Sequence, residues 1–245
     1  MDRTASKEND CRAIPHSPIR RQGRFSLITV LCTACMVLFA SEASAQCTAR
    51  DVLKNRLTLT TTASANTRSV LVRSAFAVPV WRRIAIGTFA NSFALLSALD
   101  AAGCVIGNSA EEVLARPAFT VGTSKTIVEL FAVSAAELGF QTATAPLADI
   151  YARAQQLGFG LAAAEVAPQL RLQYFDQPMG ELLIGMEPIK TWNGEPFILT
   201  VANGGAGLAL IGRDGSADAE IPVASRFLFV RSNGATLAKA GHYGR

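Results

Sequence analysis

The spacing of apolar residues along the chain changes near residue 168, from a helix-like period to alternation. Before that point, three segments carry apolar residues every three or four positions and predict helices at 91–103, 109–117 and 146–158. Two runs rich in β-branched and apolar residues, 78–89 and 126–133, predict strands among these helices. The chain between residues 76 and 168 is therefore expected to be mainly helical.

Capping signals mark the ends of these predicted helices. Asn91 is suited to cap the first helix, and Ser109 with Glu112 predicts a capping box at the start of the second. Ser134 with Glu137 predicts a second capping box on a single helical turn, 134–139. The apolar stripes expected to face the core are Phe93, Leu96 and Leu99 on the first helix, and Leu147, Ile150, Tyr151, Ala154 and Leu157 on the last.

After Pro168 the apolar positions alternate, and this pattern predicts strands. In the first of them, "QLRLQYF", Leu170, Leu172 and Tyr174 (or Phe175, if the strand has a bulge) are expected to face the core, and Arg171 and Gln173 to face solvent. Hairpin signals such as "WNGE" and "NGGAG" separate the strands that follow, "ELLIGMEPI", "PFILTVA", "LALIG" and "SRFLFVR". We therefore predict an α+β fold, with an N-terminal helical region packed on a C-terminal antiparallel β-meander of about five strands.

The N-terminus has the organisation of a secretory leader. Arg20, Arg21 and Arg24 precede an uncharged apolar run, Phe25–Ala40, and a small-residue site, Ala43-Ser44-Ala45, follows it. This pattern predicts a signal peptide over 1–45, cleavage after Ala45 and a periplasmic or secreted protein. An uncleaved signal anchor is the alternative, although the apolar run is short for a permanent span. We expect no stable membrane span after processing.

Composition and charge then limit the mature part of the chain. Without residues 1–45, 17 of the 23 basic and 15 of the 19 acidic residues remain, a net charge of +2. No basic cluster indicates nucleic-acid binding. We expect a loosely structured segment at 46–75, a single α+β domain at 76–235 and a flexible tail at 236–245.

Cysteine and histidine content restricts the chemistry further. Cys47 and Cys104 are the two cysteines of the mature part, and in an exported domain they predict one disulfide. Two free thiols in a reducing compartment are the alternative. Because His242 is the single mature histidine, no metal site, no cofactor and no histidine-dependent nucleophile are predicted.

The segment 165–189, "EVAPQLRLQYFDQPMGELLIGMEPI", combines carboxylates, an arginine and prolines with apolar runs. Its pattern A-E-V-x-P-Q-L-R-L-Q-Y, D-Q-P, G-E and M-E-P-I resembles a family of uncharacterised bacterial proteins. The preceding E-L-G-F and I-Y-x-R-A-Q-x-L-G patterns are similar too, so the resemblance covers Pro117–Ile189. At 162–164 this chain has three alanines where the family has a cysteine and a proline. The family has no established activity, so the resemblance implies no mechanism.

The same segment holds the candidate polar site, which consists of Arg171, Asp176, Glu181 and Glu187, with Glu165 as a further carboxylate. Paired carboxylates could hydrolyse envelope glycans or peptides if two of them faced one cleft about 5 to 10 Å apart. Strand alternation and turn composition account for the same residues without catalysis, so we assign no catalytic residue. The sequence favours an exported binding or interaction protein, with an envelope protein or an extracytoplasmic ligand as partner. A structural or secreted effector role is a third possibility.

Overall fold

The computed structural model describes residues 46–48 and 71–232, which belong to one unit of the chain, Ala43–Arg245. The helices of this part are η1 (Ala75–Ala77), α3 (Ser92–Ala101), α4 (Asn108–Ala115), α5 (Ala135–Leu138), α6 (Leu147–Gln156) and α7 (Val166–Arg171). The strands are β1 (Arg82–Ile86), β2 (Val105–Ile106), β3 (Thr126–Ser134), β4 (Thr144–Pro146), β5 (Phe159–Gly160), β6 (Gly180–Ile184), β7 (Ile189–Lys190), β8 (Pro196–Asn203), β9 (Leu208–Asp214), β10 (Glu220–Pro222) and β11 (Arg226–Arg231).

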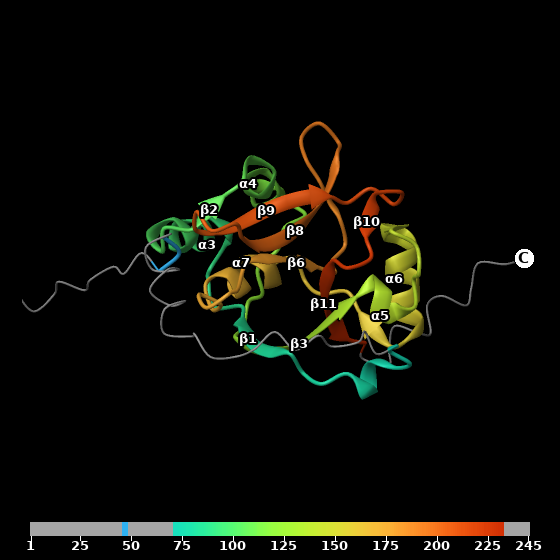
Figure 1. The fold of residues 1–245 in the computed structure, drawn as a ribbon. Coiled ribbons are helices and arrows are strands. Elements are labelled where there is room, and N and C mark those ends of the chain that lie inside the picture. The colour runs from blue at the N-terminus through green and yellow to red at the C-terminus, as the bar shows by residue number, and fades with distance from the viewer. Residues whose placement is uncertain (1–45, 49–70, 233–245) are drawn as a thin grey trace, which may run out of the picture. The chain divides into compact units, whose positions relative to one another are not determined.

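A mixed sheet of nine strands dominates the structure and curls into a half-barrel (Figure 1). Its strand order is β1-β3-β11-β6-β8-β9-β2, with β5 beside β11 and β7 beside β8, while β10 and β4 form a separate two-stranded sheet. The α-helices of the described part are five and short. The predicted helical region on a five-strand meander is therefore wrong.

The error concerns both strand content and strand pairing. The pairs β6–β8 and β8–β9 are antiparallel neighbours, as a meander requires. However, β11 lies between β3 and β6 and runs parallel to β6, and β2 runs parallel to β9. Strands β1 and β3, predicted among the helices, thus extend the same sheet. Alternation identifies a strand and its buried face, but it carries no information about which distant strand is its neighbour.

The predicted strand at 169–175 is also wrong, because the chain forms α7 and a turn there. Pro168 lies in the first turn of α7, where a missing N–H costs no intrahelical hydrogen bond. Leu170 is buried, Leu172 is half-buried and Arg171, expected at the surface, is 0% exposed. The short polar–apolar alternation in this segment therefore belongs to a helix.

The other helix predictions have mixed outcomes. Asn91 caps α3 by accepting a hydrogen bond from the Ala94 N–H. Phe93, which was predicted to face the core, is 76% exposed, and Leu95 is buried instead. The capping box of Ser134 and Glu137 is confirmed on α5.

Helix α4 differs from its prediction at its start. It begins after Gly107 without a side-chain cap, and Glu112 accepts a hydrogen bond from the Trp192 N–H instead. On α6, the buried stripe is confirmed for Leu147, Ile150, Tyr151 and Ala154.

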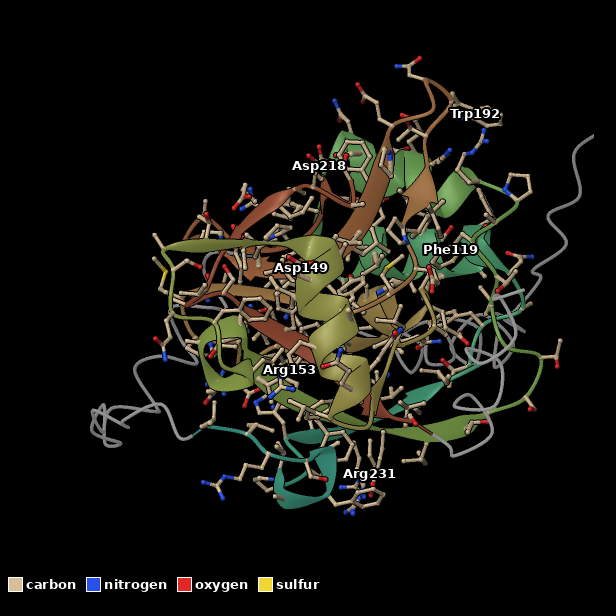
Figure 2. All side chains as sticks on the ribbon, turned by 90° about the vertical axis from the view of Figure 1, so that its right-hand side faces the viewer. Phe119, Asp149, Arg153, Trp192, Asp218 and Arg231 are labelled. Atoms are coloured by element: carbon tan, nitrogen blue, oxygen red, sulfur yellow. A yellow bond between two sulfur atoms is a disulfide. The ribbon has the colours of Figure 1, made fainter. Side chains whose placement is uncertain are left out.

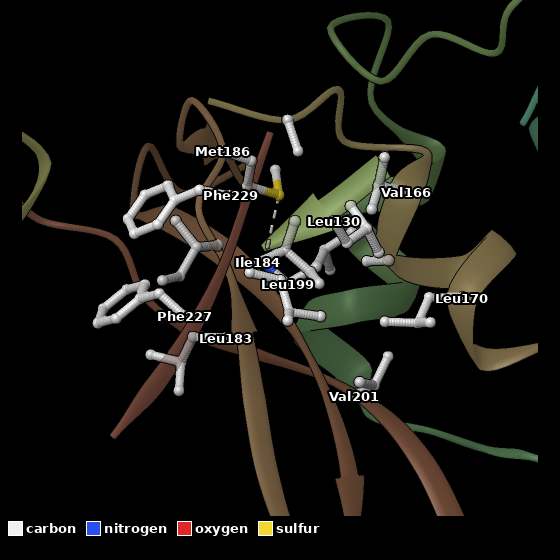
Figure 3. Close-up of a cluster of buried hydrophobic side chains, with 14 of the residues drawn as sticks. Leu130, Val166, Leu170, Leu183, Ile184, Met186, Leu199, Val201, Phe227 and Phe229 are labelled. Atoms are coloured by element: carbon white, nitrogen blue, oxygen red, sulfur yellow. Dashed lines mark hydrogen bonds between the residues drawn. The ribbon is translucent and has the colours of Figure 1, made fainter. Parts of the chain in front are cut away.

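The hydrophobic core includes apolar side chains of β6, β8, β11 and α7, and Figure 3 shows some of them around these strands. Phe227 and Phe229 stack with ring centroids 5.7 Å apart, and the Tyr151 ring of α6 packs edge-on against both. Gly185 permits this arrangement, because a Cβ atom there would lie 2.3 Å from the Phe229 ring. The aromatic cluster therefore fixes α6 against β11.

A disulfide joins Cys47 to Cys104, as predicted, with the Cα atoms 4.7 Å apart. The Cys47 N–H donates to the Ala102 carbonyl, and the Cys47 carbonyl accepts from the Leu208 N–H. Thr48 forms a β-bridge with Gly207. This part of the predicted loose segment is thus tied both to the end of α3 and to the β8–β9 turn.

Several sequence predictions fall outside the described residues. The signal peptide at 1–45, most of the segment 46–75 and the tail at 236–245 lie there. Among the helices that are described, none combines the length and the hydrophobicity needed to cross a bilayer.

Candidate functional site

Helix α7 and the turn after it are fastened to the free edge of β1 by glutamine side chains. The Gln173 amide accepts a hydrogen bond from the Ala85 N–H at 2.9 Å and donates one to the Ala85 carbonyl at 2.8 Å. One helical turn earlier, Gln169 accepts a hydrogen bond from the Thr88 hydroxyl at 2.9 Å. Gln173 occupies the place of a neighbouring strand and Gln169 bonds to the loop after β1, so the role of both here is structural.

Glu165 continues this polar face and connects two loops. Its carboxylate is buried and accepts hydrogen bonds from the Gly87 N–H at 3.1 Å and the Gly122 N–H at 2.9 Å. A Cβ atom at Gly122 would lie 2.9 Å from the carboxylate, so glycine allows the approach. Both carboxylate oxygens of Glu165 are therefore engaged in holding backbone.

Arg171 is a buried cation bonded to neutral groups. Its guanidinium donates to the Gln177 side chain and to the carbonyl of Tyr174, and lies 3.5 Å from the carbonyl of Ala202. Burial lowers the pKa of Arg171 to about 10, and nearby Asp176 partly opposes that shift. Gln177 in turn donates to the backbone of β8. The arginine predicted to face solvent is thus the centre of a buried network.

The remaining predicted carboxylates have separate environments. Asp176 forms an ion pair with Arg82 at 3.4 Å, and Glu181 forms one with Arg213. Glu187 is exposed. Of the predicted polar site, the structure brings Asp176 within electrostatic range of Arg171, while Glu181 and Glu187 make other contacts.

A groove of about 950 Å³ runs beside β3, on the side of the segment 71–81. We call it the Trp81 groove. Its walls are mainly apolar and include Val72, Val78, Pro79, Val80, Trp81 and Val133. This volume lies at the upper end of the range of small-molecule sites. None of the predicted carboxylates of 165–189 lines it.

Charged side chains at the Trp81 groove are predominantly basic. Arg73 and Arg226 line it, and an Arg226 nitrogen lies 3.5 Å from the Ala132 carbonyl. Glu137 also lines it, but this carboxylate already accepts hydrogen bonds from the backbone and hydroxyl of Ser134. Two guanidinium groups beside one engaged carboxylate favour an anionic group in the groove.

Residues of the segment 165–189 support the wall of the Trp81 groove. The Arg82 guanidinium lies 4.1 Å from the Tyr174 ring centroid, and the Trp81 and Tyr174 rings meet edge-on at 5.3 Å. Asp176 also forms the ion pair with Arg82. Burial raises the pKa of Tyr174, while the positive charge of Arg82 opposes the shift. Residues 174–176 thus position Trp81 without lining the groove.

A second, smaller groove of about 400 Å³ lies beside residues 126–131 of β3, and we call it the Ile127 groove. It is lined by Ile127, Val128, Phe131, Val166, Val230 and Arg231, among others. Ile127 is 59% exposed. Figure 2 shows Arg231 far from Trp192, the exposed tryptophan of the β7–β8 hairpin.

The sequence prediction did not identify the residues of either groove. Trp81 and Ile127 appeared as ordinary strand residues, and Arg226 and Arg231 as the ends of a strand. An apolar residue that remains exposed cannot be recognised without its neighbours. The adjacent Trp81 and Arg82 were the available signal, because this pair combines a large aromatic side chain with a charge.

Comparisons with protein-family models, curated proteins and solved structures found no match for this chain. Within the described residues, no group of three or more histidine, cysteine, aspartate or glutamate side chains is placed to hold a metal ion. The functional assignment therefore depends on the geometry of the grooves.

Proposed function

We propose that this chain is an exported, non-catalytic protein that binds a ligand in the Trp81 groove, in the periplasm or outside the cell. The leader at 1–45, with cleavage after Ala45, directs export in this proposal. The Cys47–Cys104 disulfide supports it, because such bonds persist in oxidising compartments.

The observation that carries the proposal is the composition of the Trp81 groove. Val78, Val80 and Trp81 offer an apolar wall, and Arg73 and Arg226 offer guanidinium donors at the same groove. Such a combination suits an amphiphile with an apolar body and a carboxylate, phosphate or sulfonate group. The ligand class of this proposal is therefore an anionic amphiphile.

Binding explains the groove better than hydrolysis by paired carboxylates does. Such a hydrolase requires two carboxylates facing one cleft. The Trp81 groove has one carboxylate among its lining residues, Glu137, and that group caps α5. Asp176, Glu181 and Glu187 line neither groove.

The test is calorimetric titration of the exported protein with decyl phosphate, and with decanol as the uncharged control. We expect decyl phosphate to bind and Arg226→Gln to weaken it about 10-fold or more, because a charge-assisted hydrogen bond contributes about 1.5–3 kcal/mol. Arg213→Gln, which changes an arginine outside the groove, should leave the affinity unchanged. Equal binding by wild type and Arg226→Gln, or no binding at all, would overturn the proposal.

Export is tested separately by N-terminal sequencing of the protein recovered from the cell envelope and the medium. We expect the sequence to begin at Gln46. An intact leader on membrane-bound protein would instead indicate the uncleaved anchor.

A further inference from the structure

Strand β3 has a different partner on each half of its length. Its first five residues pair with β1, from Thr126↔Ile86 to Leu130↔Arg82. Its last four residues pair with β11, from Phe131↔Phe229 to Ser134↔Arg226. Because β3 lies between β1 and β11 in the sheet, its first half has no strand on the β11 side among the described residues.

The direction of the backbone groups along β1 shows which N–H and carbonyl groups of β3 do not bond to β1. The N–H and carbonyl of Ala85 bond to Gln173 and so point away from β3. Neighbouring residues of a strand point their backbone groups in opposite directions, so Ile84 faces β3 and pairs with Val128. Ile127 and Glu129 therefore direct their N–H and carbonyl groups toward the Ile127 groove. No described residue forms a hydrogen bond with those groups.

Strand β11 does not cover this open edge, because its described pairing with β3 ends at Phe229. Beyond Phe229, Val230 pairs with Gly160 and Arg231 pairs with Phe159 of β5. The chain covers the comparable edge of β1 with Gln173 and Glu165. The edge of β3 at Ile127 has no such side-chain cover among the described residues.

A guanidinium group lies in the same groove. The Arg231 Cζ atom is 4.5 Å from the Phe131 ring centroid and 5.0 Å from that of Phe76, so two rings orient the side chain. Its Nε is buried and has no hydrogen-bond partner in the described part of the chain. Arg231 also lines the groove, so an acceptor on a ligand there would give its guanidinium a partner.

We propose that the Ile127 groove is a docking site for an extended segment of a partner polypeptide that carries a carboxylate. The segment adds a strand to β3 through the backbone of Ile127 and Glu129, and its carboxylate binds Arg231. Donors and acceptors repeated two residues apart, about 6.8 Å along a strand, match the backbone of another strand. The positive charge of Arg231 selects an acidic side chain or a free C-terminus.

The first test needs no ligand and uses amide hydrogen exchange of the full chain, resolved by residue. In the free protein, the Ile127 and Glu129 amides should exchange at least about 100-fold faster than Val128, which faces β1. Protection of Ile127 equal to that of Val128 would overturn the proposal. Protection that rises with protein concentration, together with a dimer in sedimentation, would show that a second copy fills the groove, and would overturn it too.

The second test uses the acetylated hexapeptide Thr-Val-Thr-Val-Thr-Asp with a free C-terminus. It should protect the Ile127 and Glu129 amides, whereas the amidated Asn analogue should bind about 10-fold more weakly because it lacks carboxylates. An analogue with alternate backbone amides methylated should not bind. If the methylated analogue binds as well as the parent, strand addition is wrong.

Variants locate the binding site. Ile127→Pro removes the N–H that faces the groove without removing a hydrogen bond to β1, and Ile127→Ala keeps that N–H. We expect Ile127→Pro and Arg231→Gln each to weaken peptide binding by about 10-fold or more, and Ile127→Ala to weaken it less. Arg226→Gln in the other groove should have no effect. If Ile127→Pro, folded by circular dichroism, binds like wild type, the proposal fails.

Discussion

Gln173 forms both hydrogen bonds of a β-bridge with Ala85, although one partner is a side chain and the other is backbone. The amide thereby covers the free edge of β1 and fixes the turn after α7 to the sheet. Gln173 also donates to the Gln169 carbonyl at 2.9 Å, so its orientation is set from its own helix. Gln173, an exposed residue of the segment 165–189, thus has a defined structural role.

Removing this amide should destabilise the fold measurably. Gln173→Ala leaves the Ala85 backbone to water, and we expect a loss of about 1–2 kcal/mol in the free energy of unfolding, since the two hydrogen bonds to Ala85 and the one to the Gln169 carbonyl are lost. Urea unfolding followed by circular dichroism measures the loss. Gln155→Ala, at an exposed position of α6, is the matched control and should change stability by less than about 0.5 kcal/mol. Equal values for the two variants would contradict the structural role.

Replacing Arg171 should destabilise the fold more than replacing most other polar residues of the chain. Arg171→Met removes the donors for the Gln177 side chain and the Tyr174 carbonyl inside the protein. We expect a loss of about 3–5 kcal/mol, because buried acceptors are left unpaired. The exposed Arg213→Met should cost less than about 1 kcal/mol. A loss below 1 kcal/mol for Arg171→Met in urea unfolding would contradict the buried network.

The disulfide should stabilise the fold by restricting the conformations of the unfolded chain. Cys47 and Cys104 are 57 positions apart, and closing such a loop stabilises by about 4 kcal/mol in the chain-entropy model. The double variant Cys47→Ser with Cys104→Ser should therefore unfold at lower urea concentration by a comparable free energy. Thiol labelling of unreduced, denatured mature protein should detect no free thiol. Two labelled cysteines would show that the bond does not form.

Some strands and caps could be predicted from the sequence because their signals are local. The capping box of Ser134 and Glu137, the hairpin at 191–195 and the disulfide all depend on residue types at short spacing or on a count. The parallel pairing of β11 with β6 depends on which surfaces meet across the chain, and no local pattern reports that.

The candidate site was harder to predict for a related reason. Arg171 has the sequence context of an exposed strand residue, and only the packing of α7 against β8 and β9 shows that it is buried. Trp81 and Ile127 line grooves, and among the described residues no strand pairs with Ile127 on the side away from β1. A sequence pattern indicates the local structure that a residue favours, whereas a groove depends on where the neighbouring strands and side chains lie.

Tyr151 provides a pH-dependent test of the core. Burial raises its pKa above the ordinary value of 10.0, and the hydrogen bond from the Met186 N–H opposes the shift. Above pH 10 the unfolded chain therefore loses the Tyr151 proton while the folded chain keeps it, so folding stability falls as pH rises. The contribution approaches about 1.4 kcal/mol per pH unit.

Tyr151→Phe removes this dependence and also removes the hydrogen bond with Met186. At pH 8 the variant should be less stable than wild type by about 1 kcal/mol, and this gap should close as the pH approaches 11. Urea unfolding at pH 8, 10 and 11 measures both effects. Tyr174→Phe is the companion variant, because burial also raises the pKa of Tyr174 while the positive charge of Arg82 opposes the shift. A gap between wild type and Tyr151→Phe that stays constant from pH 8 to 11 would show that the Tyr151 hydroxyl titrates alike in the folded and unfolded chains. The hydroxyl would then not be buried beneath α6 as the structure describes.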